Sequence, residues 1–491
     1  METACEHAYS GSEECTMREH PQAHGVEGQI VRRGDAAYES IRTSMVWNGL
    51  TPGRRPEVIV RVASERDVPA AVRTARAEGL RIAVRAGGHN WSGTSLRDGG
   101  MLLDLSRLRR FEIDAASATA TVQPAVRGQD LMPALARESL AFPGGHCPSV
   151  ALGGYLLSGG LGWNSAAWGP ACASVLEIEA VTADGEFLRC SEKENADLFW
   201  AARGAGPGFF AVVTGFRIAL YPLPRAIRTT THAFPLEDVE RVTSWVTDTA
   251  EELAPTVESV LVLATAAPDM TSRSPRPKVV VAGATVFAGT DEEADASLAP
   301  LRDCPFADRA LFSDTDRPTS FDALYADSAA VWPPEHRYAA DTLWSDEDFT
   351  TLLAKLSEPA AASPSDQSLV LAPVLPVSTD ERLLRDMAFS VLGRSYVVPY
   401  AVWDDPAEDA VQMRWLREAM HAVEPFGTGH YIAEADLTAA ASRAERSFAP
   451  ADWQRLRALR AAYDPDGVFH SYLTPEEGGA SYPDPEEGDA L

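Results

Sequence analysis

Glycine is concentrated in three short groups in the first half of this sequence, and these groups restrict what the chain can fold into. They lie in RAGGHNWSG around Gly87 and Gly88, in PGGHCPSVALGGYLLSGGLGW from Gly144 to Gly162, and in RGAGPGFF around Gly204, Gly206 and Gly208. Glycine adopts positive φ and lets the backbone approach a ligand closely, so such groups can direct N–H groups at a pyrophosphate. A single group is more often a set of turns, and that interpretation stays open. Three groups together favour a cradle for a ligand.

Two common kinds of nucleotide site do not match the pattern. No group forms GxGxxG at the start of a helix after the first strand, so a Rossmann site is a poor match. The chain has three lysines, Lys193, Lys278 and Lys355, and none precedes Ser or Thr, which excludes a Walker A loop. With 43 Lys and Arg against 71 Asp and Glu in 491 residues, the net charge is -28. This acidity argues against a nucleic-acid or anionic-membrane partner and favours a small-molecule function.

The cysteines and the chain ends favour a reducing cytoplasm. Six cysteines in so long a chain form no CxxC pair, and residues 1–25 contain no apolar signal-like stretch. No stretch approaches 18 apolar residues, so we expect no membrane span. His89 and Cys147 have no neighbours at the spacing of zinc ligands, and we expect no metal.

The order of elements predicts two domains. Residues 57–63, 67–79, 81–86, 101–108 and 119–124 read as a βαβ unit continued by two strands, followed by a helix over 127–140 and strands over 175–184 and 208–220. Asp184-Gly185 is a hairpin signal. We place a boundary near residue 225, because longer polar helices and apolar runs such as 259–266, 278–288 and 396–403 follow it. Residues 226–380 contain no motif that indicates a substrate.

Reasoning from the residues alone ends at a glycine-rich cradle that contains one His and one Cys, because a GxSxG hydrolase motif is also absent. Taken singly, His89 is more often a turn or core histidine and Cys147 a buried inert thiol.

The two longest motifs resemble those of a known family. VRAGGHNWSGTSLRDGGMLLDLSRLRRFEID and PAVRGQDLMPALARESLAFPGGHCPSVALGGYLLSGGLGW are similar to the berberine bridge enzyme-like FAD-linked oxidases of the vanillyl-alcohol oxidase (PCMH-type FAD-binding) superfamily, in their bacterial secondary-metabolism type. The match covers residues 56–225 and roughly 380–472, including YDPDGVF near the end.

The resemblance implies an α+β, two-domain PCMH-type FAD-binding fold whose substrate domain is an antiparallel sheet covered by helices. We expect a disordered segment 1–29, an FAD domain 30–225, a substrate domain 226–430, a segment 431–473 that returns to the FAD domain, and a disordered acidic tail 474–491.

By the same resemblance, FAD is bound covalently to His89 and Cys147. The residues expected to line the cofactor are Arg85, Ala86, Gly87, Gly88, Asn90, Ser92, Gly144, Gly145, Val150, Gly153, Gly154, Gly159, Gly160, Gly162 and Val213, with Tyr155 near the ring. His146, beside Cys147, would lower the thiol pKa if protonated, although a solvent-facing turn residue is the more ordinary interpretation. In this family a Val three residues after the linked cysteine admits dioxygen, and Val150 holds that place.

The catalytic base is less defined. The family's Tyr-x-Asn-Tyr run is GHYIAEADL here, which keeps Tyr431 and puts Glu434 at the place of the second Tyr. A buried Glu434 with a raised pKa would accept a hydroxyl proton, and an exposed acid at a helix start is an equal alternative. Tyr400 is the competing base, ahead of Tyr396 and Tyr338.

We therefore expect an oxidase that oxidises an alcohol, hemiacetal or amine of a natural-product or sugar substrate, transfers hydride to flavin N5 and reduces dioxygen to hydrogen peroxide. The alternatives are an oxidative or redox-neutral cyclase, an FAD dehydrogenase, and a binding protein without catalysis. The partners are a small-molecule substrate and dioxygen, and the protein is a monomer or homodimer.

Overall fold

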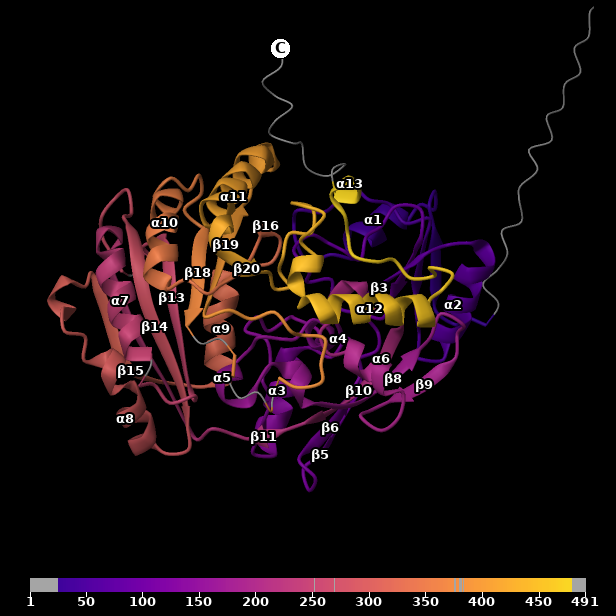
Figure 1. Ribbon diagram of the computed structural model, residues 1–491, viewed down its shortest axis with the longest axis horizontal. Helices are drawn as coiled ribbons and strands as arrows, with labels where there is room; N and C mark the ends of the chain where they lie inside the picture. Colours follow the sequence, from indigo (N-terminus) through magenta and orange to yellow (C-terminus); the bar gives the residue numbers. More distant parts are fainter. Residues whose placement is uncertain are drawn as a thin grey trace, which may run out of the picture.

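Two sheets build the first part of the molecule (Figure 1). The computed structural model describes residues 25–250, 252–268, 270–374, 377–378, 382 and 384–478. The first sheet has the order β1 (Gln29–Arg32), β2 (Val58–Arg61), β4 (Met101–Asp104), β3 (Ile82–Arg85), in which β2, β4 and β3 are parallel. Helix α2 (Asp67–Glu78) connects β2 to β3 and buries Val68, Ala71 and Val72 against this sheet, as the βαβ pattern predicts. The chain enters β2 from helix α1 (Tyr38–Thr43).

The second sheet is antiparallel. Its order is β5 (Phe111–Asp114), β6 (Thr119–Val122), β10 (Val212–Ala219), β8 (Val175–Val181), β9 (Phe187–Cys190). The predicted hairpin at Asp184-Gly185 joins β8 to β9, with Gly185 at φ +74°. The helices of the first part that follow the first sheet are α3 (Gly128–Arg137), α4 (Leu152–Leu157), α5 (Ser165–Trp168), α6 (Ala196–Ala201) and the 3-10 turns η1 (Ala171–Ser174) and η2 (Gly206–Gly208).

The helix predicted over 127–140 is shorter than expected. Helix α3 ends at Arg137, because Ser139 adopts φ +58°. Leu140 then enters the short strand β7 (Leu140–Ala141), which pairs with β11 (Tyr221–Pro222). The left-handed conformation of Ser139 ends the helix. Leu140 is therefore buried by strand pairing, although the helical spacing of apolar residues assigns it to the helix.

A nine-stranded antiparallel sheet forms the second part. Its order is β15 (Phe312–Thr319), β12 (Ala226–Pro235), β14 (Lys278–Ala288), β13 (Val257–Thr265), β18 (Leu369–Val374), β19 (Ser395–Trp403), β17 (Leu343–Ser345), β20 (Gly427–Gly429), with β16 (Arg337–Ala340) also paired with β19. Helices α7 (Val239–Ala250), α8 (Asp291–Arg302), α10 (Phe349–Ala361) and α11 (Asp409–Val423) cover its outer face, whereas α9 (Phe321–Val331) lies on the side of the first part (Figure 1). The connecting 3-10 turns are η3 (Leu236–Asp238), η4 (Ala307–Arg309), η5 (Pro406–Glu408), η6 (Glu424–Phe426) and η7 (Glu445–Ser447).

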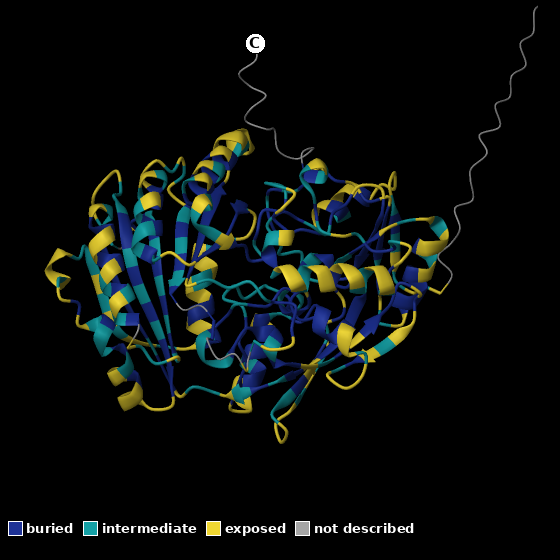
Figure 2. Ribbon diagram, viewed as in Figure 1, coloured by how far each residue is buried: buried dark blue, intermediate teal, exposed yellow. Residues whose placement is uncertain are grey.

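The two faces of this sheet differ in burial. Along β13, residues such as Leu261 and Leu263 are fully buried under the helices, whereas Val260 and Val262 between them are half-buried on the inner face. Figure 2 shows the alternation as dark blue and teal bands along the strands. Side chains alternate across a strand, so the inner residues of the sheet line the space facing the first part.

The end of the chain returns to the first sheet. Phe469 pairs with Ile82 of β3, and the Ile82 amide donates to the Val468 carbonyl at 2.7 Å. Helix α12 (Pro450–Tyr463) precedes this contact, and α13 (Pro475–Gly478) follows it.

Most of the two segments predicted to be disordered lies outside the described residues, but their inner boundaries need correction. At the N-terminal boundary, strand β1 already begins at Gln29 and pairs with β2. Ordered chain also continues to Gly478, beyond the predicted start of the tail at residue 474, because Glu477 forms a 2.6 Å ion pair with Arg97. Within the described part of the chain, no helix is long and apolar enough to cross a membrane, and no group of three His, Cys, Asp or Glu side chains is arranged to hold a metal.

Candidate active site

A single cavity of about 1120 Å³ runs between the inner face of the large sheet and the loops of the first part. Both of the longest sequence motifs open into it, and so do strands β12, β13, β14, β18 and β19. Pockets for one drug-sized ligand usually measure about 300–1,000 Å³. The cavity is therefore larger than a usual site for one drug-sized ligand.

The loop after β3 turns its amides toward this cavity. Arg85 holds the loop from behind by donating to the carbonyls of Ala86 and Gly87 at 3.2 and 3.1 Å, and the Trp47 amide donates to the Gly88 carbonyl at 2.9 Å. In a trans peptide the C=O and the next N–H point in opposite directions, so the N–H groups of residues 87–89 face away from these anchors. No described residue accepts from those three amides.

Gly88 is required by the shape of this loop. Its φ is +73°, and a Cβ there would lie 2.2 Å from the Met45 carbonyl oxygen. A larger residue would therefore displace the loop. Unpartnered amides at a cavity wall form an anion-binding concavity, which fits a pyrophosphate.

His89 and Cys147 share the cavity. The His89 ring stacks on Trp47 with a centroid distance of 4.8 Å, and Trp47 stacks on Tyr338 at 4.9 Å. Burial, aided by the charges of Arg127 and Arg85, lowers the pKa of His89 to about 3, so its imidazole is neutral. Cys147 is a free, half-buried thiol 3.4 Å from the Ser149 hydroxyl. A neutral imidazole has a nitrogen lone pair, and a cysteine outside a disulfide can react as its thiolate, so both side chains are available for covalent attachment of a ligand.

The predicted cofactor residues divide into two sets. Those that line the cavity are Arg85, Ala86, Gly87, Gly88, His89, Asn90, Gly145, Cys147, Val150, Gly153, Gly154, Tyr155, Gly162 and Val213. Four others, Ser92, Gly144, Gly159 and Gly160, do not line it, and their contact with the cofactor stays a prediction. They support the wall instead, as when Gly144 accepts from the Trp163 amide at 3.0 Å.

Tyr155 explains part of the second glycine group. The Tyr155 hydroxyl donates to the Pro143 carbonyl at 2.7 Å. A Cβ on Gly162 would lie 2.2 Å from the Tyr155 hydroxyl oxygen. In the third group, Gly206 lines the cavity, whereas a Cβ on Gly204 would collide with the Phe389 backbone. These glycines therefore serve both as cavity wall and as space for packing.

Glu434 lies in the same cavity at the end of a hydrogen-bonded set of aromatic side chains. It accepts from the Tyr396 hydroxyl at 2.9 Å and the Tyr400 hydroxyl at 3.0 Å. Burial raises the pKa of Glu434, and the hydrogen bonds from Tyr396, Tyr400 and Trp91 oppose this shift. Burial and the Glu434 charge raise the pKa of both tyrosines well above 10. The arrangement favours Glu434 over Tyr400 as the proton acceptor.

The other two tyrosines have different roles. The Tyr431 hydroxyl oxygen accepts from the amides of Gly160 and Leu161 at 2.9 and 3.3 Å, which ties the Glu434 turn to the second glycine group. Tyr338 does not line the cavity, and its hydroxyl donates to the Pro333 carbonyl. This placement removes Tyr338 from the candidates for a base.

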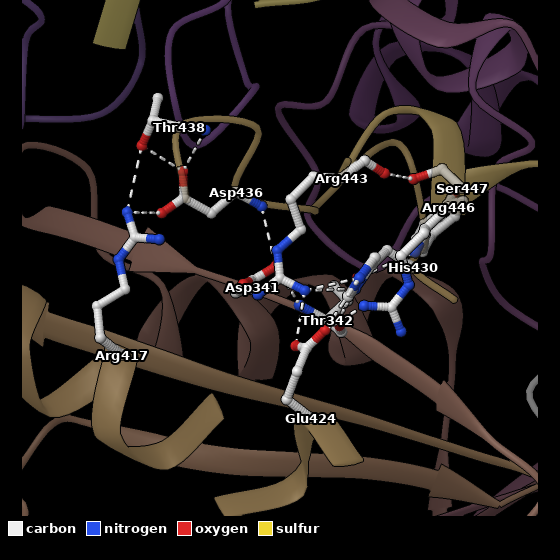
Figure 3. A network of polar contacts seen from close by, with 11 residues as sticks. Asp341, Thr342, Arg417, Glu424, His430, Asp436, Thr438, Arg443, Arg446 and Ser447 are labelled. Carbon is white, nitrogen blue, oxygen red and sulfur yellow. Dashed lines mark hydrogen bonds and ion pairs between the residues drawn. The ribbon is translucent and has the colours of Figure 1, made fainter. Parts of the chain in front are cut away.

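A buried charged network holds the turn that bears Glu434. The Tyr431 amide donates to the Thr342 hydroxyl at 3.0 Å and the Asp436 amide to the Asp341 carboxylate at 3.0 Å, so both ends of the turn are fixed to one dipeptide. In Figure 3, Arg443 extends toward Asp341, Glu424 and His430, and its nitrogens lie 2.8, 2.8 and 2.6 Å from their nearest atoms.

His430 in this network is neutral. Burial and the Arg443 charge lower its pKa below the ordinary value, and its Nδ1–H donates to the Thr342 carbonyl at 2.6 Å while Nε2 accepts from Arg443. None of the residues labelled in Figure 3 lines the cavity, so they act on it through the turn.

Sequence reasoning found Tyr396 and Tyr400 of the large sheet but missed Glu258. Glu258 of β13 lies 2.6 Å from His146 Nε2 and accepts from the Asn164 amide at 3.1 Å, which joins the two parts of the molecule at the cavity. Burial lowers the pKa of His146, but the charge and hydrogen bond of Glu258 and the charge of Glu434 together raise it by more. His146 is therefore an ion-pair partner rather than a solvent-facing turn residue. The sequence signal for Glu258 was an acidic residue at a position of strand β13 whose side chain faces the cavity.

Comparisons with known proteins agree with this geometry. A family described as "FAD binding domain" matches residues 56–191. "FAD-linked oxidoreductase ptmO" of Penicillium ochrochloron is 34% identical over 82% of this chain and 87% of its own. The chain belongs to the FAD-linked oxidoreductases. This oxidoreductase is also 38% identical to "(R)-6-hydroxynicotine oxidase" of Paenarthrobacter nicotinovorans, over 41% of this chain and 43% of that one.

Solved structures support the fold expected from the sequence. The crystal structure of 6-hydroxy-D-nicotine oxidase from Arthrobacter nicotinovorans matches with TM-score 0.79 and 26% identity, over 92% of this chain and 98% of that chain. Berberine bridge enzyme from Eschscholzia californica matches with TM-score 0.75 at 20% identity, over 91% and 96% of the two chains, which bears on the fold alone. The oxidoreductase has the two-domain PCMH-type fold. The relatives that share 32–34% identity over most of the chain are fungal, so the predicted bacterial type finds no support.

The cavity fits FAD on its own chemistry. The amides of residues 87–89 are free to bind a pyrophosphate, and the volume exceeds what one substrate needs. The residues that would hold the cofactor are the Arg85–Asn90 loop, the wall around Gly153 and Val213, and the side chains of His89 and Cys147.

Proposed function

We propose that this FAD-linked oxidoreductase is an oxidase with flavin attached to both His89 and Cys147, acting on an alcohol, hemiacetal or amine carbon and using dioxygen as acceptor. One observation carries the proposal: a neutral imidazole, a free thiol and a carboxylate of raised pKa open into one cavity. Bound FAD supplies the two-electron acceptor. The named oxidase among the relatives and the neighbour with a 6-S-cysteinyl, 8α-N1-histidyl FAD support the same assignment.

Glu434 acts as the base in this proposal. Its carboxylate takes the proton from the substrate hydroxyl or ammonium group as the neighbouring C–H bond breaks. Tyr396 and Tyr400 keep the carboxylate oriented by donating to its two oxygens, at 2.9 and 3.0 Å. The raised pKa strengthens Glu434 as a base once it is ionised.

Val150 supports dioxygen as the acceptor. It lines the cavity three residues beyond Cys147, and its amide donates to the Cys147 carbonyl at 3.3 Å. We propose that a larger residue here would obstruct access by dioxygen.

The attachment is tested by denaturing the holoenzyme in detergent and measuring flavin fluorescence on the polypeptide. We expect the flavin to stay bound in wild type and in either single variant, His89→Ala or Cys147→Ser, and to be released in the double variant. Cys172→Ser is the matched control, because Cys172 is a buried free cysteine outside the cavity. Release of flavin from wild type refutes covalent attachment.

Oxidase activity is tested separately. A panel of alcohols, amines and sugars is screened for anaerobic bleaching of the flavin, and the active compounds for peroxide formed in air. Bleaching followed by slow reoxidation in air identifies a dehydrogenase, and product formation without bleaching identifies a redox-neutral cyclase.

A further inference from the structure

The inner face of the large sheet carries an apolar surface that the fold leaves without a protein partner. It consists of Val260, Val262, Ala264, Val281, Leu369 and Leu371, which we call the trench. All six are half-buried and line the cavity, although their neighbours on the same strands are buried under helices α7, α8, α10 and α11. An open face of an antiparallel sheet is normally polar, so an aliphatic one indicates an apolar ligand.

The trench is continuous with the proposed base. Tyr400, which donates to Glu434, pairs directly with Leu369 on the next strand. Leu371 pairs with Val262 of β13, and Val262 pairs with Val281 of β14. Side chains of directly paired residues lie about 4.5–5.5 Å apart at Cβ. The aliphatic surface therefore extends from the base across three strands.

The polar groups of the cavity flank the trench. Glu258 and Thr265 lie at the two ends of β13, and Thr285 lies on β14. Thr229 and Thr231 lie on β12, beyond β14 and away from β19. The carboxylates of Asp327 and Asp366 are neutralised by Arg317 and Arg276 at 2.8 and 3.3 Å. The trench side chains carry no hydrogen-bonding group, so a sugar bound there would lose hydrogen bonds to water at each hydroxyl without replacement.

Aromatic rings enclose the end of the trench at the base. Trp332 meets Tyr400 at a centroid distance of 4.8 Å, and Trp91 meets both at 5.9 and 5.5 Å. These rings and Trp47 line the cavity. The surface next to Glu434 is therefore aromatic, which favours an apolar body on the reacting molecule.

We propose that the substrate is an elongated, largely hydrocarbon molecule with one reacting hydroxyl or amine at Glu434 and its apolar body in the trench. This inference rests on the proposed function, because it takes Glu434 as the site of reaction. It selects a hydrocarbon-rich substrate over a carbohydrate.

The test is calorimetric binding of butan-1-ol, hexan-1-ol, octan-1-ol and decan-1-ol to the holoenzyme under nitrogen after its flavin has been reduced with dithionite and can no longer oxidise them, with cellobiose as the carbohydrate probe. Each methylene that enters the trench should tighten binding about three- to fourfold. Affinity independent of chain length, or cellobiose binding more tightly than octan-1-ol, overturns the proposal. Because binding is measured without turnover, the result is independent of whether the enzyme proves to be an oxidase.

A substitution locates the binding. Val262→Ser should reduce the gain per methylene for the longer alcohols and leave butan-1-ol unchanged, whereas Val411→Ser on the exposed face of α11 should change neither. Flavin content and the unfolding temperature confirm that both variants are folded. An unchanged gain per methylene in a folded Val262→Ser variant refutes the assignment to the trench.

Discussion

Replacement of Glu434 by Gln gives the most direct test of the proposed chemistry. The amide has nearly the shape of the carboxylate and keeps one acceptor oxygen for Tyr396 or Tyr400, while the other hydroxyl must turn to accept from the new NH₂ group. We therefore expect the variant to fold and to retain its flavin. The amide cannot take a proton, so the base is lost.

The expected size of the effect follows from the role of a general base. Such a group contributes about 10²- to 10⁴-fold to the rate, which corresponds to about 3–5 kcal/mol of transition-state stabilisation. The assay is anaerobic bleaching of the flavin in a stopped-flow instrument, with whichever compound of the panel reduces wild type. Glu112→Gln, on the exposed edge strand β5, is the control and should bleach at the wild-type rate.

The pH dependence gives a second readout. Burial raises the pKa of Glu434, and only the ionised form accepts a proton, so the wild-type rate should rise with pH through a value above the ordinary glutamate pKa of about 4.3. The variant should lack this rise. A wild-type bleaching rate in Glu434→Gln, or the same pH-dependent rise, refutes the assignment of the base.

Three further substitutions probe separate features. Val150→Leu should slow reoxidation of reduced enzyme in air without slowing bleaching; equal stopped-flow reoxidation rates would remove Val150 from dioxygen access. Arg443→Met leaves the buried Asp341 carboxylate without its cation, although Glu424 keeps Arg446, and should lower the free energy of unfolding by about 3–5 kcal/mol in urea titration; Arg443→Lys should recover part of this loss, and equal stabilities would contradict the network's role. Gly88→Ala should lose FAD, because a left-handed alanine costs about 1–2 kcal/mol and its Cβ also meets the Met45 carbonyl. Gly99→Ala, at φ +75° with open space around it, should keep FAD, and retention by both variants would show that the loop tolerates a side chain.

The sequence predicted the elements that depend on local pattern. The βαβ unit, the hairpin at Asp184-Gly185 and the cavity positions of His89 and Cys147 follow from periodicity, turn chemistry and motif. For Glu434 the sequence left a buried and an exposed position open; the structure places it in the cavity, where it accepts from the Tyr400 hydroxyl, and its role as base stays a prediction.

Features that depend on the packing of distant segments were not predicted. Glu258 appears in an ordinary alternating strand, and only the meeting of the two parts places it 2.6 Å from His146. Gly160 was assigned to the cavity wall, yet its amide donates to Tyr431, 271 positions later in the chain. A glycine that makes room for another side chain and one that makes room for a ligand have the same local sequence signal.

The alternation along β13 separates two kinds of mutational tolerance within one strand. Leu261 and Leu263 face the helices in a close-packed core, where adding or removing one methylene disturbs the packing and changes stability. Val260 and Val262 face open space, so their replacement alters the cavity without disturbing that core. Variation at every second position can therefore change which molecules the enzyme accepts at little cost in stability, and a single scaffold of this kind can diversify its chemistry by point substitutions on one face of a sheet.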